Sequence, residues 1–180
     1  KYYSLEETWP RCPNCAINDL IPAGTQAKVK LKIRPGGFDD QSQGWTAGLA
    51  SIGNAGAVYL NCEFTVIEGP YAKRKIYSLI GLKSPKGPWW GNKGRTFIKN
   101  ILNSAYGISE TDQSPGAIEC RKLASLNDID GLEFEASISI GKDSNSRPKN
   151  EIEDAVVLAD SKEYEEPSVE KVVSTTKQTE

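Results

Sequence analysis

The sequence predicts a mainly β fold, built as a small five-stranded barrel with one helix after the third strand. Two observations lead to this prediction. Several segments alternate apolar and polar residues with a period of two, which is typical of strands that bury one face. One segment instead places its apolar residues three and four positions apart, which is the pattern of an amphipathic helix. With 180 residues, the chain is long enough for one domain of ordinary size and a tail.

The first predicted strand follows an irregular lead-in over residues 1–20 and ends at Pro35. Its apolar side chains face one way, and four cations face the other: Lys28, Lys30, Lys32 and Arg34. This alternation predicts a half-buried strand with a positive exposed face. The next segment, residues 38–56, is rich in Gly, Ser and Gln around Trp45. It predicts a long connection or a loose hairpin.

Residues 58–66 and 75–82 predict the second and third strands. The turn signal Glu68–Tyr71 lies between them, so we expect the two strands to form an antiparallel pair. The period of the apolar residues then changes. A helix is predicted over residues 93–106, and Gly107 closes it.

A shorter helical or irregular piece is predicted over residues 117–126, followed by strands at 132–140 and 152–158. Five strands with one helix after the third fit a small OB-fold-like barrel. An antiparallel sandwich with a helix packed across one end would use the same strands, so it stays open as the alternative. We expect one domain over residues 21–159. Residues 160–180 are acidic and contain almost no core formers, which predicts a disordered tail.

Charge is distributed unevenly along the chain. Residues 1–150 contain 19 Lys and Arg against 15 Asp and Glu, whereas residues 151–180 contain three Lys against nine acids. Between Gly69 and Ser109 there are eight basic residues and no acid. The formal net charge of −2 is therefore compatible with a strongly positive surface patch.

The acid-free stretch combines cations with flat rings, the two chemistries that hold a single nucleic-acid strand. Cations replace the counterions of phosphates, and rings give unpaired bases a surface for stacking. Trp89 and Trp90 are flanked by Gly and Pro, so we expect both indoles in a loop, one anchored to the core and one available for stacking. The candidate phosphate-binding residues are Lys28, Lys30, Lys32, Lys73, Arg74, Lys75, Lys83, Lys86, Lys93, Arg95 and Lys99, and the candidate stacking residues are Tyr77, Trp89 and Trp90. A solvated basic face with tryptophans covering a core is the alternative interpretation.

Other residue types argue against an enzyme or a cofactor. The chain has no histidine, the commonest general base. Cys12 and Cys15 have the spacing of half a zinc site, but the second half is missing, so we expect reduced thiols and no metal. Asp39–Asp40 and Asp128–Asp130 lack the spacing of a known metal site and are expected to form turns.

The sequence also predicts a cytoplasmic protein that does not enter a membrane. No apolar run approaches the roughly 18 residues of a membrane span. The first residues, Lys1–Glu7, lack the charged and then apolar pattern of a secretory signal. An oligomer is compatible with the sequence.

Several motifs occur in a familiar order within residues 20 to 158. They are Ile21–Gly24, Tyr59–Val66, Glu68–Tyr77, Ala105–Ile108 and Ile129–Phe134. In this order the chain resembles a family of phage and mobile-element proteins that are encoded beside recombination genes and are similar to single-stranded DNA-binding proteins with OB folds. The resemblance implies a role in DNA replication or recombination in a bacterial host cell, and DNA over RNA. The cysteine-bearing N-terminus and the loop around Trp45 depart from the family, so the resemblance implies no role for them.

Two functions follow from these observations. The first is a non-enzymatic, largely sequence-independent single-stranded DNA-binding protein. The alternative is a structural or adaptor protein of a phage or mobile element, whose basic patch binds an acidic protein partner. We expect the acidic tail to compete with nucleic acid for the basic groove and to recruit recombination or replication proteins; a plain solubilising tail is the other interpretation. A sugar-binding module is disfavoured by the excess of Lys near the indoles.

Overall fold

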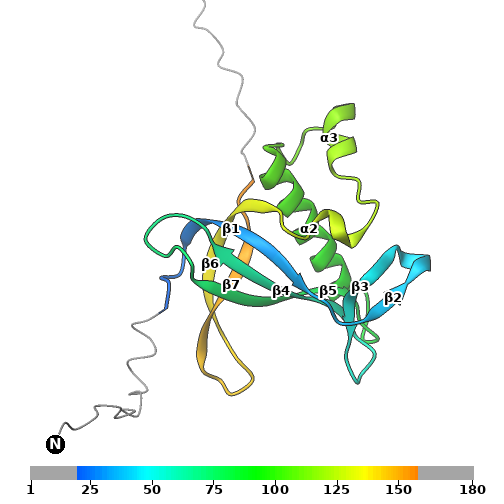
Figure 1. Ribbon diagram of the computed structural model, residues 1–180, viewed down its shortest axis with the longest axis horizontal. Helices are drawn as coiled ribbons and strands as arrows, with labels where there is room; N and C mark the ends of the chain where they lie inside the picture. Colours follow the sequence, from blue (N-terminus) through cyan, green and yellow to red (C-terminus); the bar gives the residue numbers. More distant parts are fainter. Residues whose placement is uncertain (1–19, 158–180) are drawn as a thin grey trace, which may run out of the picture.

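The structure is a computed structural model that describes residues 20–157. The described chain is mainly β, as predicted, and consists of a curled antiparallel sheet with one main helix after the fifth strand (Figure 1). The predictions for the N-terminal lead-in, for Cys12 and Cys15, and for the acidic tail lie outside the described residues.

The described residues form seven strands: β1 (Thr25–Arg34), β2 (Phe38–Asp40), β3 (Trp45–Ile52), β4 (Val58–Val66), β5 (Lys75–Lys83), β6 (Glu133–Lys142) and β7 (Pro148–Ala155). The helices are α2 (Trp89–Tyr106) and α3 (Pro115–Cys120), with single 3-10 turns η1 (Gln41–Gln43) and η2 (Leu126–Asp128). Six strands follow one another in the hydrogen-bonded order β2-β3-β4-β1-β6-β7, and β5 pairs with β4. The strands join into a single sheet, so the two stacked sheets of a sandwich are not found in this part of the chain.

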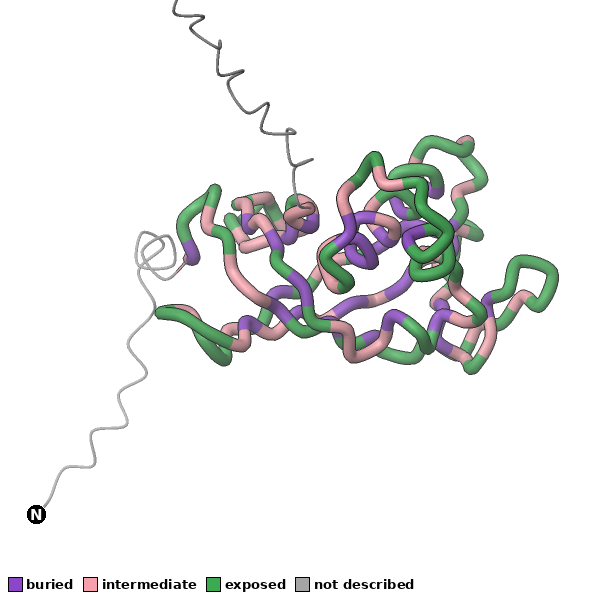
Figure 2. Tube along the Cα trace, turned by 90° about the horizontal axis from the view of Figure 1, so that it is seen from above, coloured by how far each residue is buried: buried purple, intermediate pink, exposed green. Residues whose placement is uncertain are grey.

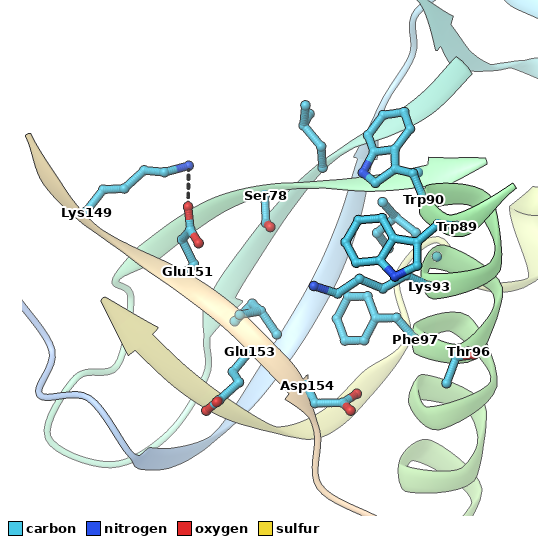
Figure 3. Close-up of a pocket in the computed structure, with 15 residues that line it drawn as sticks. Ser78, Trp89, Trp90, Lys93, Thr96, Phe97, Lys149, Glu151, Glu153 and Asp154 are labelled. Atoms are coloured by element: carbon cyan, nitrogen blue, oxygen red, sulfur yellow. Dashed lines mark ion pairs between the residues drawn. The ribbon is translucent and has the colours of Figure 1, made fainter. Parts of the chain in front are cut away.

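The sheet curls into a half-barrel and does not close. β5 and β7 approach each other, but they share no hydrogen-bonded pairing in the described residues. The predicted five-stranded barrel is therefore confirmed only in part: the sheet is curled as a half-barrel, but it is not a closed barrel of five strands. The physical reason is that side chains of α2, among them Trp89, Trp90 and Phe97, line the space between the two strands (Figure 3). Direct pairing of β5 with β7 would leave no room for these rings.

The core lies on the face of the sheet that α2 covers. The period-two alternation predicted for the first strand is confirmed, because Val29, Leu31 and Ile33 are buried and their neighbours are not. Figure 2 shows buried residues alternating with intermediate and exposed ones along the chain. Phe64 of β4 packs against Phe134 of β6, with ring centroids 6.1 Å apart. Buried side chains of α2 belong to the same core cluster. Helix and sheet thus share one core.

The main helix begins at Trp89, four residues before the predicted start, so the two indoles lie in its first turn and not in a loop. Gly91 and Gly94 are buried within this helix. A Cβ added at Gly94 would overlap the carbonyl oxygen of Gly81, and one at Gly91 would lie 2.6 Å from the carbonyl oxygen of Leu82. The glycines therefore let the helix pack directly on the backbone of β5. They do not mark a break in the helix.

Two further boundaries differ from the sequence predictions. The last strand covers Pro148–Ala155 and not residues 152–158, because the turn after β6 sets its register and pairs Lys142 with Pro148. Within residues 38–56, β2 and β3 form a hairpin over residues 38–52, as one of the two interpretations of that segment expected. This hairpin lies beside the N-terminal half of α2 in Figure 1.

Candidate nucleic-acid interface

All but two of the predicted site residues fall into two groups, one on the outer face of the sheet and one around the N-terminal half of α2. The sheet group comprises Lys28, Lys30 and Lys32 on β1 with Lys75 and Tyr77 on β5. The helix group comprises Lys83 at the end of β5, Lys86 in the following loop, and Trp89, Trp90, Lys93, Arg95 and Lys99 on α2. Lys73 and Arg74 lie in the turn between β4 and β5.

The cations of the sheet group face carboxylates. Lys32 Nζ lies 2.7 Å from Asp130 Oδ2, and Lys30 Nζ lies 3.7 Å from Glu133 Oε1. Lys28 stands opposite Glu135 in the pairing of β1 with β6. The exposed row of cations predicted on β1 is present, but acids from β6 and the turn before it compensate much of its charge.

The same compensation is found on β5. Lys75 Nζ lies 2.7 Å from Glu63 Oε1, and its hydrogen bond lowers the pKa of Glu63 below the ordinary value. The pKa of Lys75 is raised by the same bond. The guanidinium of Arg34 lies 5.1 Å from the ring centroid of Tyr77, in the range of a cation–π contact. Three of the four cations of the sheet group therefore form ion pairs within the protein.

The helix group has no such partners. Lys83, Lys86, Lys93, Arg95 and Lys99 form no ion pair with a carboxylate of residues 20–157. The first turn of α2 contains no acid, and Pro88 at its N-cap provides no side-chain hydrogen bond. The free N–H groups of a helix N-terminus carry partial positive charge, which adds to that of the side chains.

The two indoles of α2 differ in environment. Trp90 lies directly over Gly81, where an added Cβ would be 2.5 Å from Trp90 Cδ2, and its ring centroid is 6.3 Å from that of Tyr59. Trp89 is 71% exposed, and Lys93 Nζ lies 5.5 Å from its ring centroid. Trp90 therefore anchors the helix start to β5, whereas Trp89 is available to a ligand.

A cleft of about 560 Å³, lined by three carboxylates and two lysines, lies on one side of α2, in the space between β5 and β7. Figure 3 shows Lys93 extending from α2 towards the strand that carries Glu151, Glu153 and Asp154. Asn100 Nδ2 donates to Asp154 Oδ1 at 3.1 Å, and Glu151 pairs with a lysine of the same strand. Three carboxylates make this wall unfavourable for phosphates.

A second hollow lies on another side of α2, between the helix and the β2–β3 hairpin. It consists of two adjoining parts of about 370 and 300 Å³ that share Gln43, Trp45, Leu82 and Arg95. We call it the hairpin groove. Lys83 and Lys99 also line it, and no acid does. Sequence reasoning missed Gln43 and Trp45; the one available signal was an isolated Trp in an otherwise polar segment.

The described residues were also compared with the requirements of a reactive cysteine, a metal site and a membrane-spanning helix. Burial, followed by the charge of Asp130, raises the pKa of Cys62 to about 12, while Cys120 is exposed. Within residues 20–157, His, Cys, Asp and Glu side chains form no group of three that could hold a metal ion. None of the helices described is both long and apolar enough to cross a bilayer.

A comparison of the sequence with protein-family models finds no match, and a comparison with curated proteins finds none either.

Proposed function

We propose that this protein binds single-stranded DNA without cutting it and largely independently of base sequence. The observation that carries the proposal is the N-terminal half of α2. There an exposed indole, Trp89, stands among cations that form no ion pair with a described carboxylate. We propose further that the protein acts in replication or recombination of a phage or mobile element in a bacterial cell, as the motif order suggests.

The chemistry of the helix group suits a single strand better than a duplex or a protein. Base–aromatic stacking contributes roughly 1–3 kcal/mol per base and needs an unpaired base. Cations that form no ion pair with a described carboxylate can bind phosphates, and this binding releases counterions. Lys93 lies beside the indole, so one nucleotide would meet both a ring and a charge. Stacking tolerates every base, which gives binding without sequence preference.

The strand order supports an OB-fold-like architecture for this proposal. Taken without the β2–β3 hairpin, the strands follow the order β5-β4-β1-β6-β7. The main helix follows the third of these strands in the sequence. An OB fold is a five-stranded, partly open Greek-key barrel that binds oligonucleotides. In this chain the opening lies between β5 and β7, and the hairpin is an insertion between the first two strands.

Removal of the exposed indole tests the proposal. Trp89→Ala should weaken binding of a labelled oligothymidylate about 5- to 150-fold, which corresponds to the roughly 1–3 kcal/mol of one stacked base. Its unfolding midpoint should stay unchanged, because the side chain is mostly exposed. Tyr106→Ala is the matched control, since this exposed ring lies on the same helix at its other end. Fluorescence anisotropy at low salt measures both affinities.

Two results would contradict the proposal. One is the absence of oligonucleotide binding by the unaltered protein at low salt. The other is an equal loss of affinity in Trp89→Ala and Tyr106→Ala. Equal affinity for the oligonucleotide and for polyglutamate would instead favour the adaptor function, in which the basic patch meets an acidic protein.

A further inference from the structure

We propose that the hairpin groove is the phosphate track of this protein, with the β2–β3 hairpin as one wall and α2 as the other. The inference rests on the proposed function and deepens it. It assigns the phosphodiester backbone of the single strand to one side of α2, and it gives the segment around Trp45 a binding role. It also excludes the cations of the sheet group from the track.

The groove is continuous along the helix. Its two parts share Gln43 and Trp45 from the hairpin, and Leu82 and Arg95 from the opposite side. Arg95 and Lys99 are four residues apart, which places them about 6 Å apart along the helix axis on one face. Two neighbouring cations along one wall suit successive phosphates of an extended strand.

The sign of the charge selects this side of the helix. Lys83, Arg95 and Lys99 line the hairpin groove without an acid, whereas the cleft between β5 and β7 is lined by three carboxylates and two lysines. A phosphate placed in that cleft would meet more carboxylates than lysines, and like charges repel. The same helix therefore has one side lined by cations alone, which attracts phosphates, and one side of mixed charge, on which Trp89 and Lys93 lie.

The hairpin keeps its own acids away from the groove. Asp40 Oδ1 accepts hydrogen bonds from the Ser42 backbone N–H at 3.0 Å and from the Ser42 hydroxyl at 2.6 Å. Asp39 Oδ1 accepts from the Gly48 N–H at 2.7 Å. Both carboxylates thus stabilise turns inside the hairpin, and neither lines the groove. The exposed Gln43 amide remains as a neutral donor at the rim.

The far end of the groove is held by a structural arginine. Arg121 lines it, but its guanidinium donates to Asn103 Oδ1 at 2.7 Å, to the Asp112 carbonyl at 2.5 Å and to the Ser109 carbonyl at 2.8 Å. These bonds fix the segment between α2 and α3. We therefore assign Arg121 a positioning role, and the phosphates to Lys83, Arg95 and Lys99.

A salt titration of oligothymidylate binding tests the track. For single strands, the slope of log K against log salt changes by about 0.7 for each phosphate contact. The double variant Arg95→Gln/Lys99→Gln should therefore lower the slope by about 1.4. The double variant Lys30→Gln/Lys32→Gln removes two cations of the sheet group that pair with carboxylates, so its slope should stay close to that of the unaltered protein. Equal slope changes in the two variants would overturn the inference.

Photo-crosslinking locates the strand directly. Gln43 is exposed, so a benzophenone amino acid in its place should form an adduct with oligothymidylate. The same group in place of Asn145, in the turn between β6 and β7, should not. If binding persists and no adduct forms at position 43, the phosphate track lies elsewhere and the inference fails while the proposed function stands. If the unaltered protein does not bind the oligonucleotide at all, the proposed function fails with it.

Discussion

The contact between α2 and β5 predicts that one glycine in the helix interior cannot be replaced even by alanine. Alanine is favoured over glycine in a helix by about 1 kcal/mol. At Gly94, however, the added Cβ would overlap the carbonyl oxygen of Gly81, and it would lie 2.8 Å from the carbonyl carbon. These are backbone atoms of a central contact, so they cannot rotate away. Overpacking of this kind costs about 1–3 kcal/mol and occasionally more.

We therefore expect Gly94→Ala to lower the free energy of unfolding by about 2 kcal/mol, which is the upper end of the overpacking cost less the gain of about 1 kcal/mol in helix propensity. The melting temperature should fall by about 4 °C for each kcal/mol. Gly116→Ala is the matched control. This glycine also lies in a helix, α3, but nothing stands within 4 Å of an added Cβ, so the substitution should be neutral or stabilising.

Urea unfolding followed by far-ultraviolet circular dichroism measures both variants. The expected result is a clear difference in sign between them. If Gly94→Ala is as stable as Gly116→Ala, helix and strand can separate without cost, and the direct backbone packing would be refuted.

Three other predictions concern single side chains. The thiol of Cys62 should resist alkylation in the folded protein, because its pKa is raised to about 12 and the thiolate is the reactive form; Cys120 should react, and peptide mass spectrometry distinguishes the two. The pair of Glu63 and Lys75 contributes stability that is complete above pH 4.5, the ordinary pKa of that carboxyl, and is lost as the pH falls through the lowered value; Glu63→Gln should therefore flatten the acid limb of a stability profile. Arg121→Ala should lower the free energy of unfolding by about 2–3 kcal/mol, because it removes charge-assisted hydrogen bonds; an unchanged urea midpoint would contradict this role.

The strands could be predicted because a half-buried strand alternates apolar and polar residues, and this alternation is visible in the local sequence. Val29, Leu31 and Ile33 show this alternation and are buried. The start of α2 could not be predicted in the same way. Gly91 and Gly94 give no signal for a helix start at Trp89 when only their neighbours in the sequence are considered. They suit a helix here because β5 lies against them, and that contact is not local.

The candidate site was predictable in composition but not in arrangement. An acid-free stretch with two adjacent indoles is visible in the sequence. Which cations keep their charge available depends on the pairing of strands that are distant along the chain. Lys30 stands opposite Glu133 because β1 pairs with β6. Trp45 reaches the groove because the hairpin lies against α2. Neither the pairing of β1 with β6 nor the position of the hairpin against α2 can be predicted from the periodicity and spacing of residues.

The opening between β5 and β7 has a consequence for how this protein behaves at high concentration. Each of these strands ends the sheet, so each has a row of backbone N–H and C=O groups that no other described strand pairs with. Such edges are templates for pairing with another molecule. The start of α2 covers the opening, and the charges of Lys149 and Glu151 stand on one edge. Loosening of α2 would therefore promote self-association through these edges before the sheet itself unfolds.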